Sequence, residues 1–259
     1  MASSKPTRTA ETAGAVETLA GTGGSDEGLL EPDPLPSHVA IIMDGNRRWA
    51  RARGLPELEG HAAGVEAIRP IVRHAVRRGI AVLSLYAFSR ENWGRSEHEV
   101  AGLFTLLEQA IRDQTDELAA QGARVRVLGR LDELPDATRR VIDEAVERTR
   151  HGERLVLNVA FNYSGRSEIV DAVRRLVASG RPAGSIDEAA IAAELYTADL
   201  PDPDLVIRTG GDQRLSNFLI WQSAYAEFYF CSLLWPDFDP VAFDEALLEY
   251  ARRARRFGR

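Results

Sequence analysis

HVAIIMDGNRRW, residues 38–49, is an apolar run that ends abruptly in an acid, a glycine and two arginines. Its unbroken apolar part, residues 39–43, is typical of a strand buried on both faces of a parallel sheet. In open α/β sheets, ligands bind beyond the carboxyl ends of the strands. This stretch therefore predicts the class of fold and also the place of a ligand site, which begins at Asp44.

Apolar runs alternate with longer amphipathic segments through the rest of the chain, as is typical of βαβ units. We expect a single α/β domain with a central, mainly parallel six-stranded sheet flanked by helices. The predicted strands are residues 39–43, 80–88, 124–128, 155–161, 205–208 and 227–231. The predicted helices are residues 61–78, 97–120, 135–150, 167–179 and 187–195, with a last one from residue 240 onward. Pro70 should kink or break the first helix because it lacks a backbone N–H, and Gly122 should end the second.

Residues 1–36 are rich in Ala, Thr, Gly, Ser and Glu and contain no aromatic side chain. Such a segment buries too little apolar surface to repay the entropy lost on ordering. We therefore expect a disordered N-terminal tail over residues 1–36 and a folded domain over residues 37–259.

Composition excludes several classes of protein. The formal net charge of -7 speaks against a nucleic acid as the main partner, because binding to a phosphate backbone usually needs a basic surface. Cys231 is the only cysteine, so no disulfide can form within the chain, which fits a reducing cytoplasm. Lys5 is the only lysine, which excludes a P-loop lysine or a Schiff base from the folded part. No run approaches the roughly 20 apolar residues that span a bilayer, so we expect a cytoplasmic chain that meets a membrane only at its surface.

Three polar segments at predicted strand ends carry many functional side chains: residues 44–49 (DGNRRW), 89–95 (SRENWGR) and 208–217 (RTGGDQRLSN). Arginine binds phosphate oxygens in pairs, and N–H groups in glycine turns add donors to the same anion. The candidates for binding a diphosphate are Arg48, Arg95, Arg208 and Arg214. Asp44, with a second acid such as Glu227, would supply the oxygen ligands that Mg²⁺ prefers.

Each of these features alone has an ordinary explanation. Asp-Gly after a strand is common in simple turns, and His61 near a helix start could cap the helix or lie in its wall. Trp49 and Trp93 would belong to the core by default. The ligand-site hypothesis depends on their occurring together at strand ends.

The same segments resemble a known family. The blocks DGNRRWA (44–50), GH (60–61), YAFSRENW (86–93), NYSGR (162–166) and residues 205–218 are similar, in this order, to the signature blocks of cis-prenyltransferases. This isoprenyl transferase family is typified by undecaprenyl diphosphate synthase. The resemblance runs from about residue 38 to residue 258. It implies a Mg²⁺-dependent homodimer with a hydrophobic tunnel between the sheet and two helices, and it makes residues 37–259 the catalytic domain.

The resemblance also implies the reaction. Isopentenyl diphosphate would be condensed with an allylic diphosphate, such as farnesyl or geranyl diphosphate, to give a longer Z-polyprenyl diphosphate. Two other readings stay open: a catalytically silent scaffold subunit of the same fold, and a phosphate-ester hydrolase that uses Asp44. A trans-prenyltransferase is disfavoured because the chain contains no Asp-Asp pair.

Roles follow from the resemblance residue by residue. Asp44 matches the aspartate that organises Mg²⁺ and the allylic diphosphate, and Glu227 matches the second metal ligand. Asn92 matches the proposed proton acceptor; since a neutral amide is a poor base, we expect it to orient substrate or to relay the proton to a diphosphate oxygen. The stretch that wraps the allylic diphosphate corresponds to Gly45, Asn46, Arg47 and Arg48. Arg208, Arg214 and Ser216 match residues that hold isopentenyl diphosphate. The other expected substrate-site residues are Trp49, His61, Ser89, Arg90, Glu91, Trp93, Arg95 and Leu215. The ending Arg256-Phe257-Gly258 resembles one that reaches the site of the neighbouring subunit.

The chain departs from the family pattern at three positions. Glu57 stands where the family often carries an arginine that contributes to diphosphate binding. An acid facing a diphosphate would repel it, so either Glu57 points away or another arginine compensates. Asp212 replaces a common glutamate, and Gln213 replaces a histidine found in some members.

Product length in this family depends on how deep the tunnel runs before a bulky side chain closes it. Ala87 beside the active-site loop is small, which predicts a product near the undecaprenyl class, although it could be small only for sheet packing. Residues 103, 104, 106 and 107 present an apolar helix face that is either ordinary core or the tunnel wall.

Overall fold

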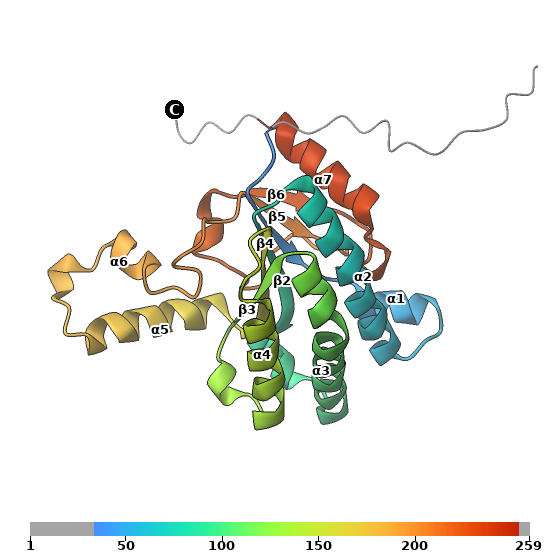
Figure 1. Ribbon diagram of the computed structural model, residues 1–259, viewed down its shortest axis with the longest axis horizontal. Coiled ribbons are helices and arrows are strands. Elements are labelled where there is room, and N and C mark those ends of the chain that lie inside the picture. Colours follow the sequence, from blue (N-terminus) through green and yellow to red (C-terminus); the bar gives the residue numbers. More distant parts are fainter. Residues whose placement is uncertain (1–33, 254–259) are drawn as a thin grey trace, which may run out of the picture. The chain divides into compact units, whose positions relative to one another are not determined.

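Six parallel strands form one sheet in the computed structural model, which describes residues 34–253 (Figure 1). The strands are β1 (His38–Ile42), β2 (Val82–Ser89), β3 (Ala123–Leu128), β4 (Leu155–Tyr163), β5 (Leu205–Arg208) and β6 (Glu227–Phe230), in the spatial order β3-β4-β2-β1-β5-β6. Every residue of β1 is buried, as its apolar run predicts. The expected six-stranded α/β sheet is confirmed, and all of its pairings are parallel.

The register of the central strands places the ligand site. Ile42 at the end of β1 lies opposite Tyr86 on β2 and opposite Arg208 on β5. Because these strands run in parallel, the segments that follow them leave the sheet at the same edge. Two of the three polar segments, residues 44–49 and 208–217, therefore meet there. The third segment begins at Ser89, the last residue of β2, three residues beyond Tyr86.

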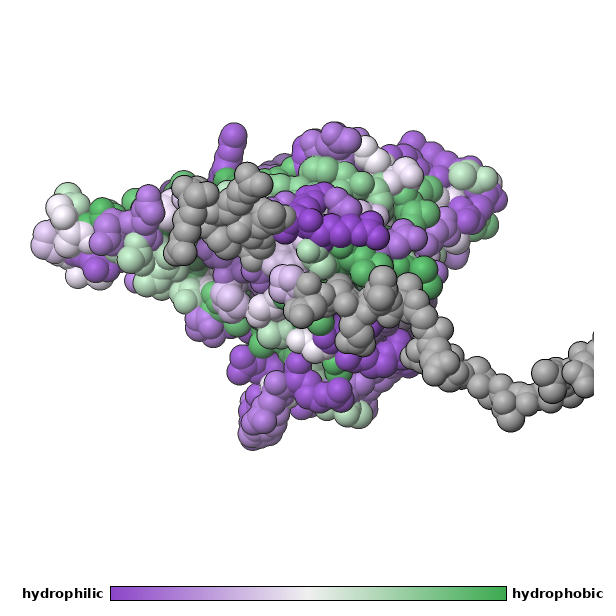
Figure 2. Space-filling view, turned by 90° about the horizontal axis from the view of Figure 1, so that it is seen from above, coloured by the Kyte–Doolittle hydropathy of each residue, from purple (hydrophilic) through white to green (hydrophobic). Residues whose placement is uncertain are grey.

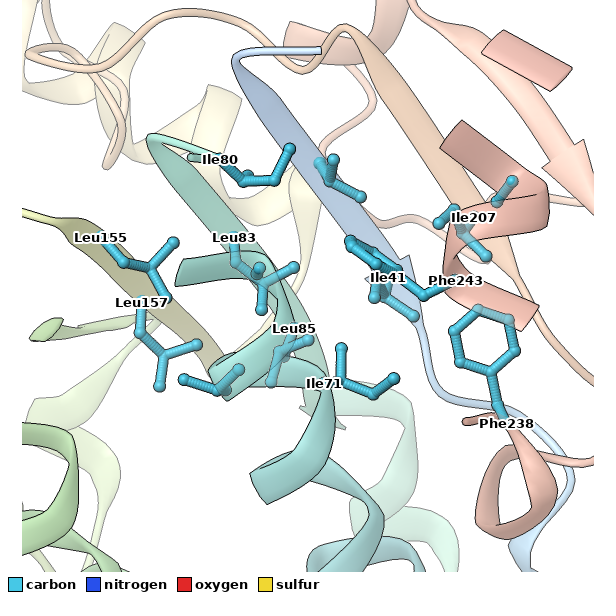
Figure 3. Close-up of a cluster of buried hydrophobic side chains, with 14 of the residues drawn as sticks. Ile41, Ile71, Ile80, Leu83, Leu85, Leu155, Leu157, Ile207, Phe238 and Phe243 are labelled. Atoms are coloured by element: carbon cyan, nitrogen blue, oxygen red, sulfur yellow. The ribbon is translucent and has the colours of Figure 1, made fainter. Parts of the chain in front are cut away.

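The helices of the described region are α1 (Asn46–Ala52), α2 (Glu57–Arg78), α3 (Glu97–Ala120), α4 (Asp136–Thr149), α5 (Gly165–Ala178), α6 (Glu188–Ala192) and α7 (Pro240–Arg252). Helices α2 and α7 pack on one face of the sheet, where Ile71 and Phe243 meet Ile41 in the main core cluster (Figure 3). Helices α3 and α4 join a second cluster that includes Phe104 and Ile142. Helices α5 and α6 extend on the other side of the sheet (Figure 1).

Four expectations about these elements need correction. Pro70 does not break α2, which starts at Glu57 and continues to Arg78. A proline inside a helix costs about 3 kcal/mol, but burial of one large apolar side chain gains about 1.5–3 kcal/mol. Helix α2 buries several apolar residues around Pro70, including Ile71 and Val72, and this burial outweighs the lost hydrogen bond. Helix α6 ends at Ala192, short of the predicted residue 195.

The other two corrections concern the loops and the tail. The sequence predicts no helix before residue 61, but Asn46 already starts α1. Of the predicted tail, residues 1–33 lie outside the described part of the chain. Leu35 packs against the main core, so the folded part begins before residue 37. The ending Arg256-Phe257-Gly258 also lies outside the described residues.

The surface carries mixed polarity. On the face that Figure 2 draws, hydrophilic and hydrophobic residues lie interspersed. Among residues 34–253, none of the helices combines the length and the apolar character needed to cross a bilayer.

A candidate diphosphate-binding crevice

The edge of the sheet is shaped by two glycines with positive φ. Gly45 (φ +116°) turns the chain from β1 into α1, a conformation that side-chain-bearing residues rarely adopt. Gly210 (φ +85°) follows β5, and a Cβ atom there would lie 2.5 Å from Nη2 of Arg48. Thr209 ties the two strand ends together, because its Oγ1 accepts the Asp44 N–H at 3.0 Å and donates to the Asp44 carbonyl oxygen at 2.7 Å. Glycine at these positions therefore lets the β1 and β5 loops approach closely.

Asp44 lies between two arginines at this edge. Arg48 donates from Nη2 to Oδ1 of Asp44 at 3.0 Å, and Arg208 donates from Nη2 to Oδ2 at 2.7 Å. Partial burial alone would raise the pKa of Asp44, but the hydrogen bonds and charges of Arg208 and Arg48 outweigh burial and lower the pKa. Asp44 is therefore a carboxylate at neutral pH.

Arg208 is the most buried charge of the site, with 3% of its surface exposed. Besides Asp44, it donates to Ser216 Oγ (2.7 Å), to the Arg214 carbonyl oxygen (2.5 Å) and to Asp212 Oδ2 (3.3 Å). Asp212 in turn accepts from Arg214 at 2.7 Å. Asp212, one of the departures from the family pattern, thus pairs with Arg208 at the end of β5 and with Arg214 in the loop that follows.

The structure brings most of the predicted site residues together. A polar crevice at this edge is lined by ten of them: Asp44, Asn46, His61, Ser89, Glu91, Asn92, Arg95, Arg208, Arg214 and Ser216. An adjoining basic hollow, lined by residues of α1 and its neighbours, adds Gly45, Arg47 and Arg48. The two hollows share Asp44, Asn46, His61 and Arg95, so they form one continuous site.

Asn92 lines the crevice with its carbonyl oxygen already engaged. Its Oδ1 accepts the backbone N–H of Ser89 at 2.9 Å and caps the short 3-10 helix Arg90–Gly94. The amide NH₂ group is the part of Asn92 without a partner in the described residues, and it is a donor. This geometry fits the expectation that Asn92 orients substrate better than it fits a direct proton acceptor.

Four of the predicted substrate-binding residues line neither the crevice nor the basic hollow. Trp49 donates to Asp237 Oδ1 at 2.7 Å, and Trp93 donates to Asn162 Oδ1 at 2.8 Å. Arg90 pairs with Glu133, and Leu215 packs against an apolar cluster around Phe218. Contact of these four side chains with a substrate stays a prediction.

Glu227 lies at the start of β6, whereas Asp44 lies beyond the carboxyl end of β1, at the opposite edge of the sheet. It faces Leu205 at the start of β5, whereas Arg208, which contacts Asp44, faces Phe230 three residues later. Three strand residues span about 10 Å, and a Mg²⁺ ion binds oxygen at about 2.1 Å. Asp44 and Glu227 of one chain therefore lie at opposite ends of the sheet, and the expectation that both bind Mg²⁺ stays a prediction. Glu227 instead accepts from Arg253 Nη1 at 3.1 Å.

The remaining acids do not assemble a complete metal site. Residues 34–253 contain no group of three or more His, Cys, Asp or Glu side chains arranged to hold an ion. The acids that line the crevice are Asp44 and Glu91, beside the arginines Arg95, Arg208 and Arg214. This donor set fits an ion such as Mg²⁺ that uses one or two carboxylates and takes its other ligands from substrate phosphates and water.

An apolar cavity opens beside the crevice, between the sheet and helices α2 and α3. Its lining includes Val65, Ile68, Leu106, Leu107, Ile111 and Leu157. Met43, Asn46, His61, Ala87 and Leu103 line both the cavity and the crevice. Ala87 therefore lies at the junction of the cavity and the crevice. Of the helix residues left open above, Leu103, Leu106 and Leu107 line the cavity, whereas Phe104 packs in the core against Phe88 and Phe161.

Glu99 and Arg51 belong to the site although they were not predicted. Glu99 accepts from Arg95 Nη1 at 2.8 Å, and its Oε1 lies 3.5 Å from Nε2 of His61. Burial and the charge of Arg95 together outweigh Glu99 and lower the pKa of His61, which is therefore neutral at pH 7. Arg51 lines the basic hollow, and its signal in the sequence is its position one helical turn after Arg47.

The chain is similar to known proteins over most of its length. Residues 42–258 match the family model described as "Putative undecaprenyl diphosphate synthase". The chain is 48% identical over 233 residues to an isoprenyl transferase of Heliobacterium mobile, covering 88% of this chain and 90% of that protein. It is 51% identical over 228 residues to isoprenyl transferase 2 of Bradyrhizobium diazoefficiens, covering 86% and 90%.

Solved structures show the same likeness. Lavandulyl diphosphate synthase from Lavandula x intermedia, in complex with dimethylallyl diphosphate, superposes with a TM-score of 0.84 at 38% identity and covers 87% of this chain and 99% of its own. A probable undecaprenyl diphosphate synthase from Campylobacter jejuni gives 0.74 at 33% identity, with 86% and 99% covered.

Proposed function

The chain belongs to the undecaprenyl diphosphate synthase family of prenyltransferases, and from this premise we propose that it elongates an allylic diphosphate with isopentenyl diphosphate. The observation that carries the proposal is the junction of two surfaces. An arginine-rich crevice suited to diphosphates adjoins an apolar cavity suited to a hydrocarbon chain, and Ala87 lines both. A substrate with a charged head and an isoprenoid tail matches this division.

The reaction forms one carbon–carbon bond and breaks one carbon–oxygen bond. The alkene of isopentenyl diphosphate attacks the allylic carbon of the primer. The diphosphate group of the primer leaves as pyrophosphate, and the condensed product then loses a proton. Negative charge grows on the departing diphosphate, so donors fixed around it lower the barrier. Arg47 and Arg48 in the basic hollow would bind this group, and Arg208, Arg214 and Ser216 would bind isopentenyl diphosphate.

We also propose that Mg²⁺ takes part through Asp44. When bound, the ion would neutralise charge on the leaving diphosphate. Asp44 would hold it with one carboxylate oxygen while Arg208 keeps the side chain in place. Asn92 would orient the isopentenyl group and help the released proton reach a diphosphate oxygen.

The cavity is proposed as the start of a tunnel for the growing chain. Its wall from α2 and α3 is apolar, and Ala87 leaves its junction with the crevice open. These features support a product of the undecaprenyl class. The homodimer and the release of lipid at a membrane surface are proposed from the family resemblance alone.

Transfer of radiolabel from isopentenyl diphosphate tests the proposed function directly. The purified chain is incubated with farnesyl diphosphate, Mg²⁺ and labelled isopentenyl diphosphate, and the extracted lipid is separated by length. Label in a lipid longer than the primer supports elongation. Release of inorganic phosphate without such a lipid would show a hydrolase instead, and neither product would show a silent scaffold subunit.

A further inference from the structure

Glu57, which stands where the family often has an arginine, holds two arginines of α1. Its Oε2 accepts from Nε of Arg47 at 2.5 Å, and its Oε1 accepts from Nη2 of Arg47 at 3.1 Å. Oε1 also accepts from Nε of Arg51 at 2.9 Å, and Arg51 Nη2 pairs with the same oxygen. Arg47 and Arg51 lie four residues apart on α1, so their side chains leave the same face of the helix.

The carboxylate lies outside the hollow that the two arginines line. Arg47 and Arg51 both line the basic hollow beside Asp44, but Glu57 does not. Glu57 occupies only the Nε–Nη2 edge of each guanidinium group. Nη1 of both arginines has no hydrogen-bond partner in the described residues and is available to a further acceptor.

The excess of positive charge in the basic hollow also favours an acid beside Arg47 and Arg51. Four arginines line the basic hollow (Arg47, Arg48, Arg51 and Arg95), against the single acid Asp44. Like charges one helical turn apart repel each other, so Arg47 and Arg51 would spread apart if nothing held them. The hydrogen bonds that Arg47 donates to Glu57 raise the pKa of Arg47, and the bonds that Glu57 accepts from Arg47 and Arg51 lower the pKa of Glu57. Arg47 and Glu57 therefore stay charged at neutral pH.

We propose that Arg51 is a further ligand of the allylic diphosphate, and that Glu57 is a positioning residue that holds Arg47 and Arg51 ready for it. The inference rests on the proposed function for the identity of this anion. Glu57 then does not repel the diphosphate. The family often has an arginine at position 57 that binds the diphosphate directly. Here Glu57 would support the same binding indirectly, by holding Arg47 and Arg51. Two guanidinium groups fixed in advance lose less side-chain entropy when the substrate binds.

Kinetics of Glu57→Gln and Arg51→Gln test the assignment, with Glu59→Gln on the same helix as the matched control. Glu59 is exposed and makes no hydrogen bond or ion pair with either arginine. Both test variants should raise the allylic KM by about five- to tenfold and leave kcat and the isopentenyl KM within about twofold, as loss of uniform binding does. A general loss of structure would instead lower kcat and change both KM values. The control should match the wild type.

A cycle of variants distinguishes positioning from contact. In a background of Arg47→Gln and Arg51→Gln, the change Glu57→Gln should have no further effect on the allylic KM, because Glu57 acts only through these arginines. An effect of full size in that background would overturn the proposal. So would a lower KM for Glu57→Gln alone, since it would mean that the acid repels the substrate.

Binding of inorganic pyrophosphate, measured by calorimetry, gives a readout that needs no turnover. Pyrophosphate should bind Glu57→Gln and Arg51→Gln more weakly than the wild type by a similar five- to tenfold factor. Equal or tighter binding by both variants would overturn the inference. If the wild type binds pyrophosphate but incorporates no isopentenyl label, the proposed function fails, and the arginine pair is still tested as an anion site.

Discussion

Asp44→Asn removes the carboxylate that links the strand ends to two arginines, and its cost can be worked out from the contacts. Asp44 accepts from Arg208 at 2.7 Å and from Arg48 at 3.0 Å. Arg208 is almost fully buried, so it loses a charged partner that water cannot replace. Removing one partner of a buried ion pair typically costs about 3–5 kcal/mol.

The expected loss of stability is smaller than that range for two reasons. Asp212 still accepts from Arg208 at 3.3 Å, and Arg48 is half-exposed, so it can be solvated. We therefore expect Asp44→Asn to lower the free energy of unfolding by about 2 kcal/mol. Turnover should fall about 100- to 1,000-fold, as when one electrostatic contributor to a transition state is removed.

Urea unfolding at several pH values measures the effect on stability. Because the pKa of Asp44 is lowered on folding, its contribution is fully present above the ordinary Asp pKa of about 3.9. It is lost as the pH falls from there through the folded pKa, so the two proteins should then converge. Asp136→Asn is the control, since that acid is exposed and, within residues 34–253, forms an ion pair with Arg139 alone. It should cost less than about 1 kcal/mol with normal turnover. Equal stability of Asp44→Asn and wild type at pH 7, or retained turnover, would refute the reasoning.

Three further perturbations have distinct expected outcomes. Ala87→Leu should shorten the product measured by reversed-phase thin-layer chromatography, because a larger side chain would narrow the junction of crevice and cavity; an unchanged product would show that the chain takes another path. Asp244→Asn should cost about 3–5 kcal/mol in urea unfolding, because this buried acid of α7 accepts from Arg78 of α2 at 2.8 and 2.6 Å; a cost under 1 kcal/mol would mean that the pair is dispensable. EDTA should abolish turnover and Mg²⁺ should restore it, and full activity in EDTA would contradict a metal role for Asp44.

Elements with strong local signals could be predicted from the sequence. Helix α3 has the predicted bounds because its start and its end are both encoded nearby. Ser96 accepts the Glu99 N–H at its N-terminus, and Gly122, with φ +75°, follows its last turn. The buried strand β1 was equally clear, since five apolar residues in a row leave few alternatives.

Features that depend on distant partners could not be read in the same way. The sequence predicts that Glu227 starts a strand, but only the register of β6 against β5 places it at the opposite end of the sheet from Asp44. Pro70 signals a helix end locally, yet the apolar face of α2 that packs on the sheet overrides it. The role of Glu57 depends on side-chain contacts with α1, a helix that the polar sequence of residues 44–49 did not indicate.

The distribution of product lengths under excess isopentenyl diphosphate tests the central claim most directly. The claim is that the allylic diphosphate and isopentenyl diphosphate are condensed in one crevice, and that the adjoining cavity receives the growing hydrocarbon chain. Mass spectrometry of the extracted lipid should show a series of diphosphates that differ by single isoprene units and accumulate near the undecaprenyl length. A wild-type protein that makes nothing longer than its primer, or that stops after one addition, would contradict this account.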